Sequence, residues 1–317
     1  MSSKPFPISG LESNPFSTAI DEKGYYHTEA NGLIAEELLH GIESRRGFLL
    51  LVGERGVGKT SLLLQLLPVL KREKVATSVV LETLTAREDL LPAIAREFGL
   101  TIPPSFTLSN VFAVLQQYIL DRNAAGKNCV IVVDEAHNLK ASALEALRML
   151  AGIKETGGGN AVQILLVGQP EILDRLDQPR LRRLRGLIGT FRKLPPLSRS
   201  EVKSYVTFMP ANAGARLRPS RTAFCLLWMT TRGNIRLIDL IMERTLHTLA
   251  GDSRQKLTAR IMLDALKDIS SGQVEVARRL RTIRLKLLAL ACVFILLVAA
   301  ACAAAIFLPS LLSSHGL

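Results

Sequence analysis

Aromatic residues and cysteines are scarce in this chain, and its N-terminal segment has no apolar run. Aromatics make up 5% of the 317 residues while 48% are hydrophobic, so the core should consist mainly of Leu, Ile, Val and Ala. Cys129, Cys225, Cys292 and Cys302 show neither a metal-ligand spacing nor a paired framework, which favours a reducing compartment. The opening residues, MSSKPFPISGLESNPF, lack the apolar stretch of a secretory signal peptide.

Acidic residues are missing from two segments, and these segments account for the net charge of +12. Residues 178–199 hold seven Lys and Arg and residues 278–286 hold five, with no Asp or Glu in either. Because the rest of the chain is balanced, the basicity forms two local patches rather than a general coat for nucleic acid. For the first patch, oligomer contacts with phosphate sensing, a solvated helix face and nucleic-acid contact all stay open as interpretations.

A long stretch without charge or proline lies near the end of the sequence. Residues 287–308 are 22 apolar residues, and as a helix they would measure about 33 Å, enough to cross the ~30 Å hydrocarbon core of a bilayer. A buried core helix is the alternative, although core helices rarely run this long without a polar face. With the basic segment before it, the stretch predicts a C-terminal transmembrane helix whose N-terminal domain faces the cytoplasm.

The segment FLLLVGERGVGKTSLLLQLL combines an apolar run, a glycine-rich loop and a helical pattern. This is the strand–loop–helix context of a P-loop, in which backbone N–H groups and a helix N-terminus surround a phosphate. Lys59 should reach the β- and γ-phosphates of ATP, and the Thr60 hydroxyl should bind Mg²⁺. The predicted nucleotide-binding residues of this segment are Gly53, Glu54, Arg55, Gly56, Val57, Gly58, Lys59, Thr60 and Ser61.

A second motif, CVIVVDEAHNL, begins with an apolar run typical of a parallel strand covered on both faces. Asp134 is predicted to belong to the nucleotide-binding site, where it holds Mg²⁺ together with Thr60. Glu135 is predicted to orient or deprotonate the attacking water. Two acids after a strand can also cap a helix, but the neighbouring P-loop favours the catalytic interpretation. The letters DEAH also occur in helicases, yet the remaining length holds no second helicase-like domain.

Alternating strand and helix patterns predict an α/β fold, a parallel sheet wrapped by helices, followed by an all-helical part after residue 198. Ligands of such sheets bind at the carboxyl ends of the strands, where Gly53, Asp134 and Gln169 fall. The expected strands are 48–52, 77–83, 129–133, 161–169 and 190–197. The expected helices are 61–73, 88–99, 107–124, 139–152, 199–209, 219–231, 234–250 and 257–269.

Within the helical part, Arg236 lies in the first turn of a helix that Gly233 and Asn234 open. A cation in a first turn opposes the helix dipole, so a purely structural role explains this arginine poorly. An arginine that reaches across to a phosphate explains it better.

Taken in order, these motifs resemble those of the AAA+ ATPases of the general secretion pathway protein A (ExeA) type, which include pilus-biogenesis and exopolysaccharide-locus relatives. The resemblance covers about residues 9–250, and besides the P-loop region it includes DEAHNL, ILLVGQPEI, LPPL and GNIRLIDL. It implies that Gln169 is the sensor-1 residue and Arg236 the sensor-2 arginine. The candidate catalytic residues are then Lys59, Glu135, Gln169 and Arg236.

The resemblance also implies ring-like homo-oligomers and an adenine site near Pro15, Phe16 and Tyr26, although these side chains could equally be core packing.

The chain departs from the family pattern at two places. The QR pair expected before LPPL is Gly186-Leu187 here, and an Arg-Leu pair expected in the next helix is Met209-Pro210. Because the expected trans arginine is absent, we expect slow turnover or a nucleotide-dependent switch.

Arg183 and Arg185 lie near the missing arginine and could replace it only by proximity. The predicted organisation is a P-loop AAA+ domain (1–198), a helical lid (199–275), a basic juxtamembrane segment (276–286), a transmembrane helix (287–308) and a short extracytoplasmic tail (309–317).

The sequence therefore predicts a single-pass protein of the bacterial inner membrane that uses ATP and Mg²⁺. Its hydrolysis should drive the assembly or energising of an envelope machine for secretion, pilus biogenesis or polysaccharide export. Two alternatives remain: a DNA-associated AAA+ regulator of the transposition type, and an anchored scaffold that binds ATP without hydrolysing it. Nucleic acid is the less favoured partner, because it would have to bind while the protein is anchored in a membrane.

Overall fold

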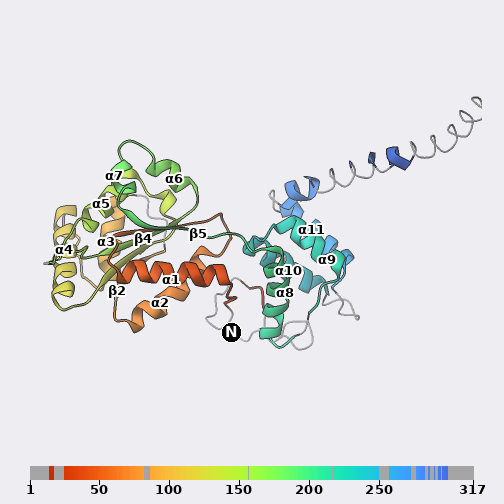
Figure 1. The fold of residues 1–317 in the computed structure, drawn as a ribbon, viewed down its shortest axis with the longest axis horizontal. Coiled ribbons are helices and arrows are strands. Elements are labelled where there is room, and N and C mark those ends of the chain that lie inside the picture. Colours follow the sequence, from red (N-terminus) through yellow and green to blue (C-terminus); the bar gives the residue numbers. More distant parts are fainter. Residues whose placement is uncertain are drawn as a thin grey trace, which may run out of the picture.

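The computed structural model describes residues 14–17, 25–81, 86–155, 157–215, 217–249, 257–272 and 276–282, with a few further residues between 285 and 298. These residues form two lobes, an α/β lobe and a helical lobe joined by the segment after β5 (Figure 1). The predicted span 287–308 lies mostly outside the described residues. Within the described ranges, no helix combines the length and the apolar character needed to cross a bilayer.

The α/β lobe alternates strands and helices along the chain. Its elements are α1 (Glu29–Glu43), β1 (Phe48–Val52), α2 (Lys59–Arg72), β2 (Ala76–Val80), α3 (Arg87–Glu97), α4 (Leu108–Ala124), β3 (Cys129–Val133), the 3₁₀ turn η2 (Ala136–Asn138), α5 (Ala141–Ala151), β4 (Gln163–Gly168), α6 (Glu171–Leu176), α7 (Arg182–Arg185) and β5 (Ile188–Lys193). The helical lobe contains α8 (Arg199–Asn212), α9 (Arg221–Thr231), α10 (Ile235–Leu249) and α11 (Ala259–Gly272).

The sheet has the strand order β2-β3-β4-β1-β5, and every pair in it is parallel. Every residue of β1, β3 and β4 is buried, as expected for central strands covered on both faces. In the register, Val52 of β1 pairs with Gly168 of β4, and Val133 of β3 pairs with Leu166. The residues that follow these three strands therefore meet at one edge of the sheet.

Alternate side chains of the strands pack against helices on opposite faces, as the two-residue period of a strand requires. Leu49 and Leu51 of β1 belong to the core formed with α1 and α2. Phe48, Leu50 and Val52 belong to the larger core formed with α3, α4 and α5. The result is the three-layer arrangement predicted from the sequence, with a buried sheet between two layers of helices.

The helical lobe has a separate apolar core built from α8 to α11. Phe16 from the N-terminal segment and Leu197 from the connection after β5 are buried in it. Val276 and Leu280, in the helical stretch 276–282 that begins the predicted juxtamembrane segment, are buried there as well. The start of that basic segment is thus packed onto the helical lobe.

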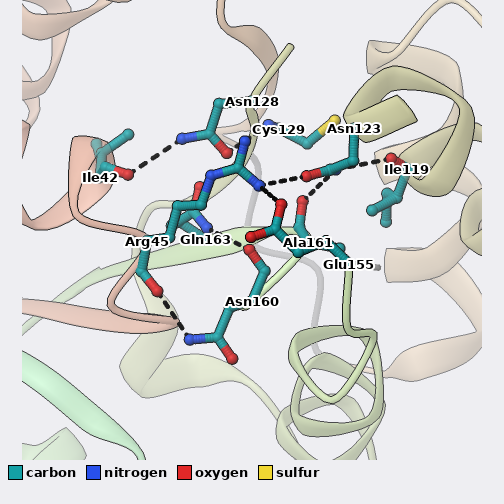
Figure 2. A network of polar contacts seen from close by, with 10 residues as sticks. All are labelled: Ile42, Arg45, Ile119, Asn123, Asn128, Cys129, Glu155, Asn160, Ala161 and Gln163. Carbon is teal, nitrogen blue, oxygen red and sulfur yellow. Dashed lines mark hydrogen bonds and ion pairs between the residues drawn. The ribbon is translucent and has the colours of Figure 1, made fainter. Parts of the chain in front are cut away.

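A polar network connects the loops at the amino ends of the strands, opposite the edge described above (Figure 2). Arg45, after α1, pairs with Glu155 and donates a 2.6 Å hydrogen bond to the Asn123 Oδ1 of α4. Asn160 donates from its Nδ2 to the carbonyl of Arg45 at 2.8 Å, and Asn123 donates to the carbonyl of Ala161 at 2.6 Å. These hydrogen bonds pair polar groups of the loops that the sheet leaves without partners and that would otherwise need water.

Most expected elements occur within a few residues of their predicted bounds, and the differences have local causes. The strand expected at 190–197 ends at Lys193, because the two prolines that follow Leu194 cannot donate ladder hydrogen bonds. Helix α1 was not expected. It is capped by Thr28, whose hydroxyl accepts a hydrogen bond from the Asn31 backbone N–H at 3.1 Å, and its two internal glycines obscure the helical pattern. The short helices α6 and α7 were not expected either.

Gly233 is required where the two lobes meet. Its φ is +82°, and a Cβ at this position would lie 1.9 Å from the carbonyl oxygen of Leu197. The same pair is joined by a 3.0 Å hydrogen bond from the Leu197 N–H to the Gly233 carbonyl. We expect Gly233→Ala to lower the free energy of unfolding of the helical lobe by about 2–4 kcal/mol, through left-handed strain and the clash.

Denaturant titration followed by the fluorescence of Trp228, the single tryptophan, measures this change. Gly32→Ala is the matched control, because Gly32 lies inside α1 with no atom within 4 Å of an added Cβ. That substitution should be neutral or stabilising by up to about 1 kcal/mol. Equal unfolding curves for Gly233→Ala and wild type would contradict the assignment.

Candidate nucleotide-binding site

The loop between β1 and α2 has the backbone conformation that a phosphate-binding loop needs. Gly56 and Gly58 adopt left-handed φ values of +81° and +98°, which side chains with a Cβ rarely tolerate. At Gly53, a Cβ would lie 2.9 Å from the carbonyl of Leu194, so this position also excludes a side chain. Helix α2 begins at Lys59 with no side-chain cap at Gly58, and its first N–H groups thus point into the loop.

Lys59 is buried inside this loop. Its Nζ donates to the carbonyl oxygens of Gly53 at 2.8 Å and Glu54 at 3.0 Å. Burial lowers the pKa of Lys59, while the carboxylates of Glu135 and Asp134 act in the opposite direction. An ammonium group held by two loop carbonyls, beside the start of a helix, is placed to bind an anion that the loop encloses.

Thr60 and Asp134 bring two oxygen ligands together. The Thr60 hydroxyl donates to Asp134 Oδ2 at 2.6 Å, and Asp134 Oδ1 accepts from the backbone N–H of Glu135 at 2.8 Å. No cluster of three or more His, Cys, Asp or Glu that could hold a metal occurs among the residues described. One carboxylate and one hydroxyl suit Mg²⁺, which keeps several waters and takes its other ligands from substrate phosphates.

Glu135 follows Asp134 in a left-handed conformation, with φ of +50°. Its Oε2 lies 3.4 Å from Nδ1 of His137. The Nε2 of His137 lies 2.8 Å from the side-chain nitrogen of Gln169, which follows β4. The structure therefore brings Glu135 and Gln169 together through a histidine that the sequence analysis did not single out.

The turn before α10 lies directly on the loop. Asn234 Nδ2 donates to the carbonyl of Arg55 at 2.6 Å, and the backbone N–H of Arg236 donates to the carbonyl of Gly56 at 3.1 Å. The side chain of Arg236 is exposed beside the loop. These contacts hold Arg236 beside the loop, although its sequence position is 177 residues beyond Lys59; its role as a sensor stays a prediction.

Phe16 and Tyr26 pack against the helical lobe. The ring of Tyr205 in α8 lies 6.2 Å from that of Phe16 and 5.4 Å from that of Tyr26, and Tyr26 also contacts Phe208 at 5.4 Å. The aromatic side chains are thus part of a cluster on the second lobe. Contact of this cluster with an adenine base stays a prediction.

The two arginines that could replace the missing family arginine differ in their surroundings. Both arginines are exposed on the short helix α7, and Arg185 at its end forms an ion pair with Asp177. Gly186 and Leu187, at the position of the expected pair, are also exposed. Action of either arginine on a neighbouring subunit stays a prediction.

Loop, helix N-terminus, lysine and carboxylate together define a P-loop nucleotide-binding domain with a helical lid. Residues 42–176 match the AAA domain family. Over 239 residues the chain is 38% identical to general secretion pathway protein A of Aeromonas hydrophila, covering 75% of this chain and 43% of that protein. The AAA domain match and this relative support an AAA+ ATPase of the general secretion pathway protein A type, and the chain spans less than half the length of this relative.

Solved structures with low sequence identity share the fold. Cdc6p of Pyrobaculum aerophilum superimposes with a TM-score of 0.66 at 17% identity, over 82% of this chain and 72% of that chain. The ORC2 protein of Aeropyrum pernix, in complexes with ADPNP and ADP, gives 0.60 at 16% identity, over 80% and 70%. These similarities establish the two-lobe architecture.

Asp239, one turn beyond Arg236 in α10, is an acidic residue in an environment that disfavours its charged form. It accepts a 2.6 Å hydrogen bond from the Tyr205 hydroxyl. The pKa of Asp239 is raised from 3.8 to about 7, mainly because the group is removed from water; the bond from Tyr205 opposes this rise, and the nearby carboxylate of Glu243 adds to it. Glu243 in turn accepts a 2.7 Å hydrogen bond from Asn14 of the N-terminal segment.

A raised pKa means that the folded protein binds this proton more tightly than the unfolded chain does. The stabilisation from Asp239 is therefore complete below pH 3.8 and is lost as the pH rises through about 7. We expect the stability of the helical lobe to fall between pH 5 and pH 8 in wild type, and to fall less in Asp239→Asn, which cannot ionise. Denaturant titrations at both pH values, read from Trp228, test this; the same pH dependence in both proteins would contradict it.

Proposed function

We propose that the protein is a membrane-anchored, Mg²⁺-dependent ATPase that drives assembly or energising of a bacterial envelope machine for secretion, pilus biogenesis or polysaccharide export. One observation carries the ATPase part: Lys59, Thr60, Asp134 and Glu135 meet at the carboxyl edge of the sheet. The kind of machine is supported by the similarity to general secretion pathway protein A of Aeromonas hydrophila.

The residues present fit ATP and Mg²⁺, and each has a defined task. The loop N–H groups and Lys59 bind the β- and γ-phosphates, and Lys59 leaves the carbonyls of Gly53 and Glu54 to do so. Thr60 and Asp134 hold the metal ion, which when bound neutralises charge on the phosphates. Glu135, outside the metal pair, orients the attacking water and accepts its proton.

The lid turn makes the position of the helical lobe depend on the nucleotide. Asn234 and the backbone of Arg236 contact the loop carbonyls of Arg55 and Gly56, while the guanidinium of Arg236 remains available to a phosphate. A nucleotide that rearranges the loop alters these contacts, and the helical lobe moves as a unit with α10. Nucleotide binding thereby becomes movement of one lobe against the other.

The second part of the proposal concerns the membrane. In the stretch 276–282, Arg279 donates from Nη1 to the carbonyls of Thr230 and Thr231 at the end of α9, at 2.9 and 3.1 Å. Val276 and Leu280 from the same stretch are buried in the lobe core. Since residues 287–308 follow closely, a span there would be attached firmly to the lid, with the N-terminal domain on the cytoplasmic side of the inner membrane.

The proposed ATPase works as a homo-oligomer, and its isolated subunits hydrolyse ATP slowly. The absence of arginine at Gly186 and Leu187, together with the ion pair of Arg185 with Asp177, supports slow turnover. Arg183 and Arg185 are both exposed, and because Arg185 forms the ion pair with Asp177, Arg183 is the better candidate to reach a neighbouring subunit. An arginine finger of this kind contributes about 10³–10⁵ in rate where it is present.

Glu135→Gln should abolish most hydrolysis without abolishing binding, because an amide cannot accept the proton from water. We expect ATP turnover to fall by about 100-fold or more, with the Kd for ATP changed less than about threefold. Phosphate release and binding of a fluorescent ATP analogue measure the two quantities. Glu97→Gln is the control, since Glu97 is exposed at the end of α3.

The outcomes separate the alternatives. If wild type binds ATP but releases phosphate no faster than Glu135→Gln, the protein is a nucleotide-binding scaffold and the motor proposal fails. Salt-sensitive binding of DNA that requires ATP would favour the transposition-type regulator. Crosslinked partners recovered from membranes that belong to a secretion, pilus or polysaccharide system would support the envelope role.

Removal of residues 283–317 should release the protein from membranes and leave the described helical lobe intact, because the stretch 276–282 is retained. We expect the full chain in the membrane fraction after alkaline carbonate extraction, and the truncated chain in the supernatant with unchanged ATP affinity. Extraction of the full chain by carbonate would show that residues 287–308 do not span the bilayer. The fluorescence of Trp228 reports whether the truncated lobe is folded.

A further inference from the structure

We infer that His137 is a positioning residue that couples Glu135 to Gln169, so that the proposed general base responds to the residue at the end of β4. The inference rests on the proposed function, because it assigns a task to Glu135 that only hydrolysis requires. It adds a third residue, His137, to the pair that motif and resemblance identified.

The contacts of His137 carry the inference. The imidazole lies between two polar groups from different strands, with Nδ1 3.4 Å from Glu135 Oε2 and Nε2 2.8 Å from the Gln169 side-chain nitrogen. Its side chain is 13% exposed, while that of Glu135 is 36% exposed. The ring is thus more enclosed than Glu135, and its contact with Oε2 restricts where this carboxylate, which is itself open to water, can lie.

The surroundings hold the ring in this place. Arg175 of α6 donates to the carbonyls of His137 and Leu139, which fixes the backbone of η2 against α6. At Gly168, the last residue of β4, a Cβ would lie 3.3 Å from the backbone nitrogen of His137 and 3.7 Å from its Nδ1. A larger residue there would crowd the histidine, so the end of β4 is shaped to receive it.

The shorter of the two contacts with Gln169 favours one tautomer. With the amide nitrogen of Gln169 donating to Nε2, the proton of the neutral ring is on Nδ1, where it faces the carboxylate of Glu135. The negative charge of Glu135 favours a proton at that position. The backbone N–H of Gln169 lies 3.4 Å from Nδ1 and would be accepted only by the other tautomer, which cannot donate to Glu135.

The contacts from Gln169 through His137 to Glu135 link the P-loop side of the site to the proposed general base. Gln169 lies beside the P-loop, because the Gly53 N–H donates to the carbonyl of Gly168 at 3.1 Å. When Gln169 turns toward the nucleotide, it leaves Nε2, and the contact between Nδ1 and Glu135 changes with it. His137 thus transmits the state of the nucleotide to the general base without contacting the nucleotide itself.

The first test examines the nucleotide-free protein and requires no activity. In protein labelled with ¹⁵N-histidine, two-bond ¹⁵N–¹H spectra distinguish the two tautomers, and His137→Asn identifies the signal among the five histidines. We expect His137 to be protonated on Nδ1 at neutral pH, and its Nε2 signal to shift in Gln169→Ala. Protonation on Nε2, or no change in Gln169→Ala, would overturn the inference.

The second test measures turnover and binding separately. His137→Ala should lower kcat by about 10- to 100-fold and change KM and the Kd for ATP less than about threefold. His137→Asn retains a donor near the position of Nδ1 and should recover part of kcat, whereas His137→Gln, with its amide near Nε2, should not. His40→Ala is the control, because His40 is exposed on α1 and bonded to Ser44.

A double-mutant cycle tests the coupling. If Gln169 acts on Glu135 through His137, the double variant His137→Ala, Gln169→Ala should lose less kcat than the sum of the two single losses in free energy, because one contact carries part of both. Additive losses would show that the two residues act independently, and equal kcat for His137→Ala and wild type would show that the contact has no role. Failure of the proposed function is distinguishable, because Glu135→Gln would then turn over like wild type.

Discussion

The parallel pairing of β1, β4 and β3 is the constraint on which the rest of the molecule depends. Val52 pairs with Gly168 and Val133 with Leu166, so the chain leaves these strands at neighbouring points of one edge. The P-loop, the acidic pair Asp134–Glu135 and Gln169 are therefore brought together by backbone hydrogen bonds alone. A slip of one residue in any pair would turn the buried side chains of that strand to the opposite face and separate these groups.

Burial makes this register unambiguous. The central strands are covered on both faces, by α1 and α2 on one side and by α3, α4 and α5 on the other, and all their residues are buried. At the amino edge, the network around Arg45 pairs the loop groups that the strands leave unpaired (Figure 2). The two edges of the sheet thus have different tasks: one is closed by polar contacts, and the other is open to a ligand.

A few residues make direct contacts between the helical lobe and the open edge of the sheet. Leu197 and Gly233 are joined by a backbone hydrogen bond, and the next residues, Asn234 and Arg236, contact the P-loop. Only glycine at position 233 allows the backbone of the turn to approach Leu197 so closely. The lobe that contacts the loop also carries the stretch 276–282, bound at the end of α9 through Arg279. A path of direct contacts therefore runs from the loop to the residues that precede the apolar segment 287–308.

The sequence by itself determined the parallel α/β class, the loop from Gly53 to Thr60, and the placement of Asp134 and Gln169 after strands. Those features have local signals, namely apolar runs, glycine spacing and the polar residues that follow. It also indicated the approximate position of most helices. It did not predict α1, because Gly32 and Gly41 interrupt the helical pattern of that segment. Only the tertiary structure decided that His137 lies between Glu135 and Gln169, that the turn at Gly233 rests on the loop, and that Val276 and Leu280 belong to the lid core. These contacts join residues from separate elements, and a pattern along one chain does not record which side chains meet after the strands have paired.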